Sequence, residues 1–284
     1  METKIIDGKQ IAREIRAELK ERIAAHVANG RPVPKMTVIL VGEDPASQVY
    51  VANKEKACGW IKMASETLRM PASTTTEEVI SAIEKLNQDP GIHGILVQLP
   101  LPDHINKEAV LKTIDPKKDV DGFHVVNAGQ LFTGTGDPLV ACTPSGVIQM
   151  LKRSGIEITG KHCVIAGRSN IVGKPMAMLM MNENATVTVI HTRTQNERAF
   201  IQDADIFIAA VGRPNRFNGD DIKEGAVVID VGIHRTENGL CGDCDYASML
   251  GKASYITPVP GGGGPMTIAM LLSNCLKAYE QQIL

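Results

Sequence analysis

Short runs of apolar residues, many of them β-branched, alternate along this chain with segments in which apolar residues recur every three or four positions. The short runs are typical of buried parallel strands, and the longer spacing is typical of helices with one buried face. We expect strands at residues 36–42, 94–98, 163–166, 185–190, 205–211 and 226–231. We expect helices at about residues 48–58, 107–113, 143–152 and 266–281. This alternation predicts an α/β protein with mostly parallel sheets.

Three helix starts carry capping residues. Asp7 precedes a helix that ends near Gly30 and has regularly spaced apolar residues, namely Ile11, Ile15, Leu19, Ile23 and Val27. Ser47 is the expected cap of the helix over 48–58, and Thr75 and Glu78 form a capping-box pattern.

The stretch from His162 to Pro175 indicates a nucleotide site. Its apolar strand over 163–166 ends at Gly167, and Gly173 and Pro175 open a helix. Strand, tight glycine turn and helix form the first unit of a dinucleotide-binding βαβ, in which the helix N-terminus receives the pyrophosphate. Ser169 replaces the second glycine of the usual fingerprint, so an ordinary βα turn remains the alternative.

The end of the next strand bears on which nucleotide is bound. NAD sites usually place Asp or Glu there, about 20 residues after the glycines, to bind the ribose 2′-hydroxyl. This chain has Thr192 and Arg193 instead, with Arg168 in the glycine loop. Guanidinium groups bind phosphate in a bidentate fork, which favours NADP over NAD. The alternative is that both arginines are solvated surface residues.

The bulk properties describe an ordinary globular protein. The chain has 284 residues, 43% of them hydrophobic and 22% charged, and a net charge of −2. This length favours two domains over one. The charge balance does not indicate nucleic-acid binding, and we expect no membrane span, signal peptide or transit peptide. A cytoplasmic protein is the simplest interpretation.

The six cysteines are scattered, and Cys241 and Cys244 form the only close pair. No second pair offers them a zinc partner, so we expect no metal site. Disulfides are not expected in a cytosolic enzyme.

Polar residues in three segments of the chain could carry chemistry. Tyr50 and Lys54 are four residues apart and share one helix face, where a ring can stack on a flat heterocycle and an amine can move a proton. A lysine taken into an apolar cleft has a lowered pKa and becomes a usable acid or base, although an exposed amphipathic face would look the same. Gln98 ends a buried strand, where ligands commonly bind. Asp119 and Asp121 lie in a loop ending in glycine, which plain turn chemistry also explains.

These residues belong to longer motifs that resemble the bifunctional methylenetetrahydrofolate dehydrogenase/methenyltetrahydrofolate cyclohydrolase family. The similarity runs from about residue 5 to residue 280, in order and at the family's spacing. Five motifs carry it: Tyr50-Val51-x-x-Lys54-x-Lys56, the run from Gly94 to Pro102, Lys118-Asp119-Val120-Asp121-Gly122, the loop from Gly167 to Pro175, and the segment from Pro258 to Thr267.

The resemblance implies two α/β domains with a cleft between them, the second a Rossmann-like, doubly wound and mostly parallel sheet. A folate-binding catalytic domain would comprise residues 1–141 and 266–284, with the final helix packing back on it, and an NADP-binding domain would comprise residues 142–265. It also implies a homodimer formed through the cofactor domain. The expected ligands are a folate substrate and NADP.

Carried over by position, Lys54 resembles the family's catalytic lysine, Tyr50 the ring that stacks on the folate, and Gln98 the residue that tunes the lysine. Asp121 resembles the carboxylate that anchors the pterin, and we include Leu99 among the substrate-binding residues. The loop near folate and nicotinamide is matched by Pro260, Gly261 and Gly264. Cofactor-contacting positions are matched by Gly167, Arg168, Ser169, Thr192 and Ile233, to which the phosphate argument above adds Arg193.

Two residues depart from the family pattern. Gly263 stands where the family usually has Val, and His234 stands where Asn commonly follows the Asp-Val-Gly-Ile strand end.

The implied function is NADP-dependent oxidation of 5,10-methylenetetrahydrofolate followed by hydrolysis to 10-formyltetrahydrofolate, with Lys54 as general acid and base. One alternative is a dehydrogenase without the hydrolytic step, and another is a folate- or nucleotide-binding protein without turnover. Neither needs Lys54, Gln98 and Asp121 together.

Overall fold

A computed structural model describes residues 1–237 and 239–283, which form two compact units. The first unit contains residues 1–13 and 141–270, and the second contains residues 14–140 and the chain from Leu271 onward. Helices α1 (Gly8–Ala28) and α10 (Gly263–Ile283) contribute residues to both units. These units divide the chain differently from the predicted domains at residues 1–13, 141 and 266–270, and the predicted functional boundaries stay a prediction.

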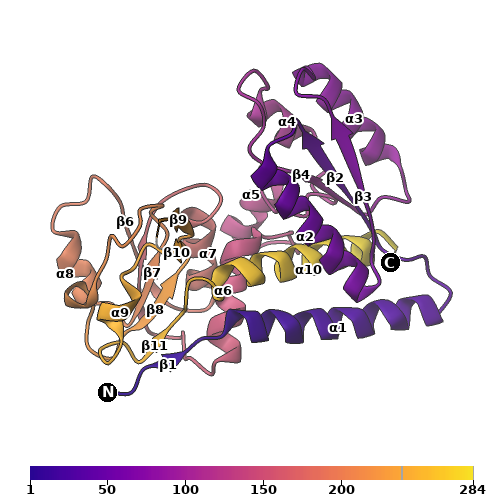
Figure 1. The fold of residues 1–284 in the computed structure, drawn as a ribbon. Coiled ribbons are helices and arrows are strands. Elements are labelled where there is room, and N and C mark those ends of the chain that lie inside the picture. Colours follow the sequence, from indigo (N-terminus) through magenta and orange to yellow (C-terminus); the bar gives the residue numbers. More distant parts are fainter. Residues whose placement is uncertain (238, 284) are drawn as a thin grey trace. The chain divides into compact units, whose positions relative to one another are not determined.

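The first unit is built on a six-stranded parallel sheet (Figure 1). Its strands, in spatial order, are β1 (Lys4–Ile5), β11 (Tyr255–Ile256), β8 (Val227–Asp230), β7 (Ile206–Ala209), β5 (His162–Ala166) and β6 (Thr186–Ile190). From β5 the chain forms β6 on one side and then β7 on the other side. The order therefore reverses between β5 and β7, which is where doubly wound sheets bind ligands at their carboxyl edge.

Short helices and one hairpin complete this unit. The α-helices are α6 (Cys142–Arg153), α7 (Gly173–Asn182), α8 (Glu197–Gln202) and α9 (Tyr246–Met249), with a 3-10 turn at Gly219–Asp221. The hairpin pairs β9 (His234–Thr236) with β10 (Gly239–Cys241).

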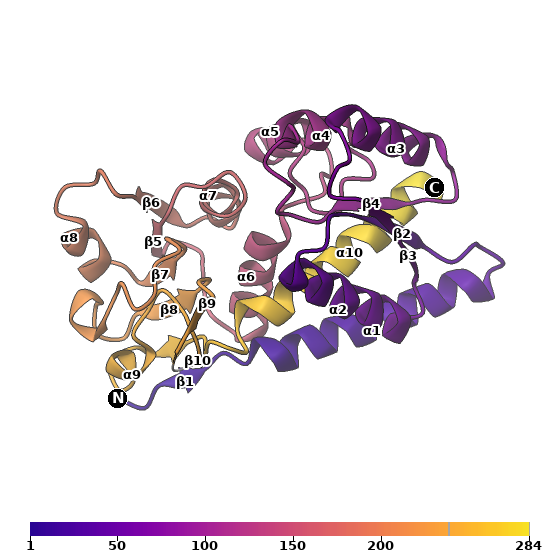
Figure 2. The same cartoon turned by 45° about the horizontal axis from the view of Figure 1, so that its top comes forward.

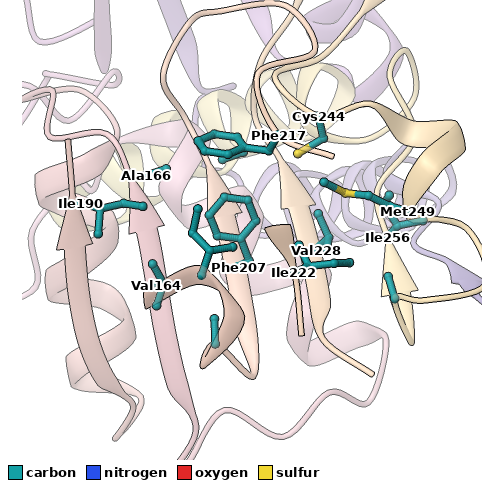
Figure 3. Packing of buried hydrophobic residues seen from close by; sticks show 14 residues of the cluster. Val164, Ala166, Ile190, Phe207, Phe217, Ile222, Val228, Cys244, Met249 and Ile256 are labelled. Atoms are coloured by element: carbon teal, nitrogen blue, oxygen red, sulfur yellow. The ribbon is translucent and has the colours of Figure 1, made fainter. Parts of the chain in front are cut away.

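An apolar cluster covers one face of the six-stranded sheet (Figure 3). Phe207 on β7 meets Phe217 edge to face, with ring centroids 5.0 Å apart and an interplanar angle of 83°. Side chains from β5, β6, β8 and β11 join them, among them Val164, Ile190, Val228 and Ile256. Burial of a large apolar side chain stabilises the fold by roughly 1.5–3 kcal/mol. The packed cluster therefore fixes the strands whose carboxyl ends carry the candidate site.

The second unit is built on a three-stranded parallel sheet in the order β3 (Ala64–Met70), β2 (Lys35–Val41), β4 (Gly94–Val97). Helices α3 (Thr76–Gln88) and α4 (Lys107–Thr113) pack on one face through an apolar cluster that includes Ile39, Ile83 and Val110. Figure 2 shows these helices on one side of the sheet and α2 (Pro45–Ile61) on the other. A further helix, α5 (Val125–Thr133), follows the loop that leaves the sheet.

The end of α10 packs into this second unit. Asn274 Nδ2 donates to the carbonyl oxygens of Val120 (2.9 Å) and Val140 (2.8 Å). The Tyr279 hydroxyl donates to the carbonyl of Pro32 at 2.7 Å. These bonds tie the chain terminus to residues more than a hundred positions earlier.

Most predicted elements are confirmed, including the Asp7 cap and the Thr75–Glu78 capping box. The Ser47 cap is wrong: Asp44 caps α2, and its carboxylate accepts the Ser47 N–H at 2.7 Å. The final helix begins at Gly263, three residues before the expected start. The pattern also missed β1, β3, α5 and the β9–β10 hairpin.

Candidate active site

Lys54 and Gln98 come together at the carboxyl edge of the three-stranded sheet. Lys54 lies on α2, which follows β2, and Gln98 directly follows β4. The Lys54 Nζ donates to the Gln98 Oε1 at 2.9 Å, and the Gln98 Nε2 donates to the Leu99 carbonyl at 2.6 Å. Gln98 is only 8% exposed, so its amide is held in one orientation. The hydrogen bond between Lys54 and Gln98 joins the two residues that the family resemblance paired.

Tyr50 lies one turn before Lys54 on the same helix, and 52% of its surface is exposed. An exposed ring beside a lysine presents a flat apolar surface to a planar heterocycle. Leu99, next to Gln98, is half-buried, and the Leu99–Pro100 peptide bond is cis.

In the loop Lys118-Asp119-Val120-Asp121-Gly122, hydrogen bonds of Lys118 and Asp119 fix the backbone that carries Asp121. The buried Lys118 Nζ donates to three carbonyl oxygens near the end of α3, those of Leu86, Asn87 and Asp89, at 2.8–2.9 Å. The buried Asp119 carboxylate accepts the His124 N–H at 2.8 Å, just before α5. Both ends of the loop are therefore fixed, and this fixes the position of Asp121.

Asp121 has an unusual electrostatic environment. Burial raises the pKa of its carboxyl, the Lys54 charge lowers it in part, and the Asp119 carboxylate adds a smaller rise, so that the resulting pKa is about 7. A carboxyl that titrates near neutral pH and interacts with a lysine is typical of a functional site. The structure thus brings Lys54, Gln98 and Asp121 into one electrostatic cluster.

In the first unit, the loop after β5 has the backbone geometry of a phosphate cradle. Gly167 has φ +120°, and a Cβ there would lie 2.2 Å from the Ala210 carbonyl oxygen. A Cβ on Gly173 would lie 2.2 Å from the Gly167 carbonyl oxygen. Only glycine fits these two positions. Ser169 fits where a glycine was expected because its hydroxyl accepts the Val172 N–H at 3.1 Å and shapes the turn.

Arg168 and Arg193 are exposed at the ends of the neighbouring strands β5 and β6. The turn after β6 is held by three hydrogen bonds. The His191 N–H donates to the Thr194 hydroxyl at 2.9 Å, the Arg193 N–H donates to the His191 Nδ1 at 3.1 Å, and the Thr194 N–H donates to the His191 carbonyl at 2.7 Å. Residues 191–194 contain no carboxylate that would repel a 2′-phosphate.

A cavity of about 460 Å³ opens beside this turn. Thr192 and Val211 line it, together with three arginines (Arg198, Arg213 and Arg216) and one acid (Glu197). Arg216 forms an ion pair with Glu197, and Arg198 donates to the Asp220 carbonyl at 2.8 Å. The lining carries net positive charge, which suits a ligand with phosphate groups. The glycine cradle, the cavity and the arginines together fit a phosphorylated dinucleotide.

The residues predicted near folate and nicotinamide also lie in the first unit. Ile233, 47% exposed, follows β8, and a Cβ on Gly264 would lie 3.3 Å from its Cδ1. Gly261 has φ +118°, and the preceding Val259–Pro260 peptide bond is cis.

Two buried carboxylates near the carboxyl edge of this sheet, Asp230 and Asp243, were not predicted as site residues from the sequence. Asp230 accepts the N–H groups of Gly232, Asp243 and Cys244 at 2.8–2.9 Å. Asp243 accepts the N–H groups of three consecutive residues after β7, together with an imidazole N–H from His234. The sequence signals were weak: an Asp at a strand end and a Gly-Asp pair directly after a hairpin.

Cys241 is half-buried and Cys244 is buried in the apolar cluster. Burial and the nearby carboxylates of Asp230 and Asp243 raise the pKa of the Cys244 thiol well above its ordinary value. Among residues 1–237 and 239–283, no group of three or more His, Cys, Asp or Glu side chains is placed to hold a metal ion. Within the same residues, the structure has no helix with the length and apolar character that a bilayer span requires.

Two family models match this chain. The model described as "Tetrahydrofolate dehydrogenase/cyclohydrolase, catalytic domain" matches residues 6–121. The model described as "Tetrahydrofolate dehydrogenase/cyclohydrolase, NAD(P)-binding domain" matches residues 141–283.

Individual proteins are similar over nearly the whole length. The "Bifunctional protein FolD" of Lachnoclostridium phytofermentans is 55% identical, over 96% of both chains. That of Chloroherpeton thalassium is 54% identical, over 97% of this chain and 98% of its own.

Solved structures agree with this similarity. The bifunctional FolD methylenetetrahydrofolate dehydrogenase/cyclohydrolase from Campylobacter jejuni has a TM-score of 0.96 at 46% identity, covering 98% of this chain and 99% of its own. The Trypanosoma brucei dehydrogenase-cyclohydrolase, described as complexed with NADP cofactor and inhibitor, has a TM-score of 0.93 at 39% identity, covering 100% and 99%.

Proposed function

Since this chain belongs to the tetrahydrofolate dehydrogenase/cyclohydrolase family, we propose that it oxidises 5,10-methylenetetrahydrofolate with NADP⁺ and then hydrolyses the methenyl product, with Lys54 as general acid and base of the second step. The observation that carries the assignment of Lys54 is its 2.9 Å hydrogen bond to Gln98, beside a carboxyl with a pKa near 7.

Loss of hydride from the one-carbon bridge leaves a cation that is delocalised over the two flanking nitrogens. When bound, NADP⁺ supplies the hydride acceptor. Tyr50 stacks on the pterin and Asp121 accepts hydrogen bonds from its amino-pyrimidine edge, so both residues orient the bridge. We also assign substrate contacts to Leu99, and to Pro260, Gly261 and Gly264 around the start of α10.

Hydrolysis requires three proton movements. Water adds to the methenyl carbon, and the neutral Lys54 amine takes the first proton that the water loses. The carbon–N5 bond then breaks while the Lys54 ammonium returns that proton to N5, and the added hydroxyl loses its remaining proton to solvent as the formyl C=O forms. The cation and one water thus become neutral 10-formyltetrahydrofolate and one released proton. Gln98 keeps the Nζ aimed at the reacting carbon while Lys54 alternates between its two states.

On the cofactor side, we assign the pyrophosphate to the loop of Gly167 and Ser169, and the 2′-phosphate to Arg168, Thr192 and Arg193. Ile233 lies at the nicotinamide end. The lack of a carboxylate after β6 supports NADP over NAD, because the usual NAD site places an acid there.

A homodimer formed through the cofactor-binding unit is part of the proposal and rests on the family resemblance. Light scattering after size exclusion tests it: a mass near twice 30.6 kDa is expected, and a mass near 30.6 kDa would contradict it.

The decisive experiment mixes purified protein, 5,10-methylenetetrahydrofolate and NADP⁺ and follows NADPH and methenyl absorbance together. Wild type should form NADPH with little methenyl accumulation, and Lys54→Met should accumulate methenyl. Lys56→Met, an exposed lysine on the same helix, is the matched control and should behave as wild type.

Methenyl accumulation in wild type and Lys54→Met alike would leave a dehydrogenase without the second step. Absence of NADPH in wild type, with a working positive control, would contradict the folate activity itself.

A further inference from the structure

The Asp243 carboxylate receives four hydrogen bonds from two different segments. Its Oδ2 accepts the backbone N–H groups of Val211 (2.6 Å) and Gly212 (3.1 Å), and its Oδ1 accepts that of Arg213 (2.9 Å). The His234 Nε2 also lies 2.7 Å from Oδ1. Because the carboxylate already accepts N–H groups here, His234 is the donor through Nε2–H. Asp243 is fully buried, so these four donors replace the water that an exposed carboxylate would have.

The backbone around Asp243 is built to admit this carboxylate. A Cβ on Gly232 would lie 2.4 Å from the Asp243 Oδ1, so only glycine leaves the space. The Asp243 N–H is in turn held by Asp230, whose Oδ1 accepts it at 2.9 Å. A Cβ on Gly242 would lie 1.9 Å from the Asp230 Oδ2. Asp243 is thus fixed at both its backbone and its side chain.

Both segments that Asp243 holds belong to the cofactor edge. Val211 and Arg213 line the 460 Å³ cavity, at the side of β5 where the strand order reverses. His234 directly follows Ile233, the residue that faces Gly264. One buried carboxylate therefore connects the wall of the adenosine cavity with the strand end assigned to the nicotinamide.

We propose that Asp243 is a positioning residue for the cofactor. It fixes the loop after β7 directly, and through its hydrogen bond with His234 on β9 it also fixes the neighbouring Ile233. This inference rests on the proposed function, because it takes the edge of the six-stranded sheet to be the NADP site. The residues assigned to hydrolysis, Lys54, Gln98 and Asp121, lie in the other compact unit.

Measuring NADPH binding and hydrolysis separately distinguishes a positioning role of Asp243 from general structural damage. In Asp243→Asn, an amide has one accepting oxygen and a donating nitrogen, so some of the four donors lose their acceptor. We expect the Kd for NADPH, measured by its fluorescence, to rise about tenfold or more. Hydrolysis of added methenyltetrahydrofolate, measured without any nucleotide, should stay within about twofold of wild type, because its residues are not touched.

Asp205→Asn is the matched control for a lost carboxylate in the same unit. Asp205 Oδ2 accepts the His162 N–H at 3.0 Å, and its Oδ1 pairs with Lys223, but it lies at the amino end of β7, away from the cofactor edge. This variant should keep both NADPH binding and hydrolysis.

His234 supplies a second test that does not depend on the fold surviving loss of Asp243. His234→Gln places an amide N–H close to the position of Nε2, whereas His234→Leu has no donor. NADPH binding should weaken several-fold in His234→Leu and recover in His234→Gln.

Unchanged NADPH binding in both Asp243→Asn and His234→Leu would overturn the proposal. An equal loss of hydrolysis and NADPH binding in Asp243→Asn would overturn it too, since that pattern indicates global damage. If Asp243→Asn does not fold, the His234 pair decides, and equal NADPH affinities in Gln and Leu would count against the inference. Failure of the proposed function itself would already be visible in wild type, as absence of hydrolysis or of NADPH binding.

Discussion

The Lys54 Nζ donates a 2.9 Å hydrogen bond to the Gln98 Oε1, although the two residues are 44 positions apart in the sequence. Parallel pairing of β2 with β4 explains this contact, because the carboxyl ends of both strands then meet at one edge. The lysine lies on the helix that follows β2, and the glutamine directly follows β4.

Replacing Gln98 should therefore impair the hydrolytic step more than hydride transfer. In Gln98→Leu the Nζ loses its amide acceptor, and we expect hydrolysis of methenyltetrahydrofolate to fall by about 10²-fold, the lower range for general acid–base catalysis. Single-turnover NADPH formation should fall less than tenfold. The exposed Gln88→Leu in the same unit is the control. Equal losses in both steps would mean that Gln98 binds substrate without tuning Lys54.

Asp121 should impose a pH dependence on substrate capture. Burial raises the pKa of its carboxyl to about 7, so the free protein gains the anion only as the pH rises through neutrality. The ionised form accepts hydrogen bonds from the pterin edge, so kcat/KM for the folate should rise between pH 6 and pH 8. Asp121→Asn should have a lower kcat/KM at every pH, and its kcat/KM should not rise between pH 6 and pH 8. A wild-type profile that is flat over this range would contradict the assignment.

The same carboxyl should affect stability with the opposite sign. Because the folded-state pKa is raised from 3.8 to about 7, the folded protein retains a proton that the unfolded chain loses in this window. The contribution of this carboxyl to the free energy of unfolding is fully present below pH 4. It is lost as the pH rises through 7, by at most about 1.4 kcal/mol per pH unit. Asp121→Asn removes this effect, so its urea stability should improve relative to wild type from pH 5 to pH 8. A constant difference between the two proteins would refute this.

The elements that could be predicted from the sequence are those whose pattern is local. The apolar strand over 163–166 and the helix after Gly173 are both confirmed, since burial on both faces leaves a continuous apolar run. Strand β3 was missed because it lies at the edge of its sheet and four of its seven residues are polar. The cap of α2 was misplaced by three residues, although Pro45 in the first turn indicated a cap just before it.

The site divides in the same way. Tyr50 and Lys54 were found together because helix spacing is a local property. Gln98 was predicted at a ligand site because it ends a buried strand, and its pairing with Lys54 was implied by the family resemblance. Asp243 could not be predicted, since its four donors come from positions 211–213 and 234 and meet it only in the folded sheet. Burial of a carboxylate depends on tertiary partners that no short window contains.

Arg168 should contribute to the preference for NADP. Loss of a charge-assisted contact to phosphate costs about 1.5–3 kcal/mol, so Arg168→Ala should raise the KM for NADP⁺ by about 10- to 100-fold. The KM for NAD⁺ on the same variant should change less than threefold, because NAD⁺ lacks the 2′-phosphate. A parallel rise for both nucleotides would instead place Arg168 on the pyrophosphate.

Gly263 and Gly262 provide a last comparison, between a glycine that the fold needs and one that it does not. At Gly263, the first residue of α10, an added Cβ would lie 4.0 Å from its nearest neighbour, the Asp230 carbonyl oxygen, which is ordinary contact. At Gly262 an added Cβ would lie 2.8 Å from the Pro258 carbonyl oxygen. Gly263→Ala should therefore stabilise the protein by about 0.5–1 kcal/mol, chiefly by restricting the unfolded chain, whereas Gly262→Ala should destabilise it. Urea unfolding of the two variants and wild type measures both effects. If Gly263→Ala is the less stable of the two, the loop before α10 does not have the space described here, and the departure from the family's usual Val at this position would have a steric cause.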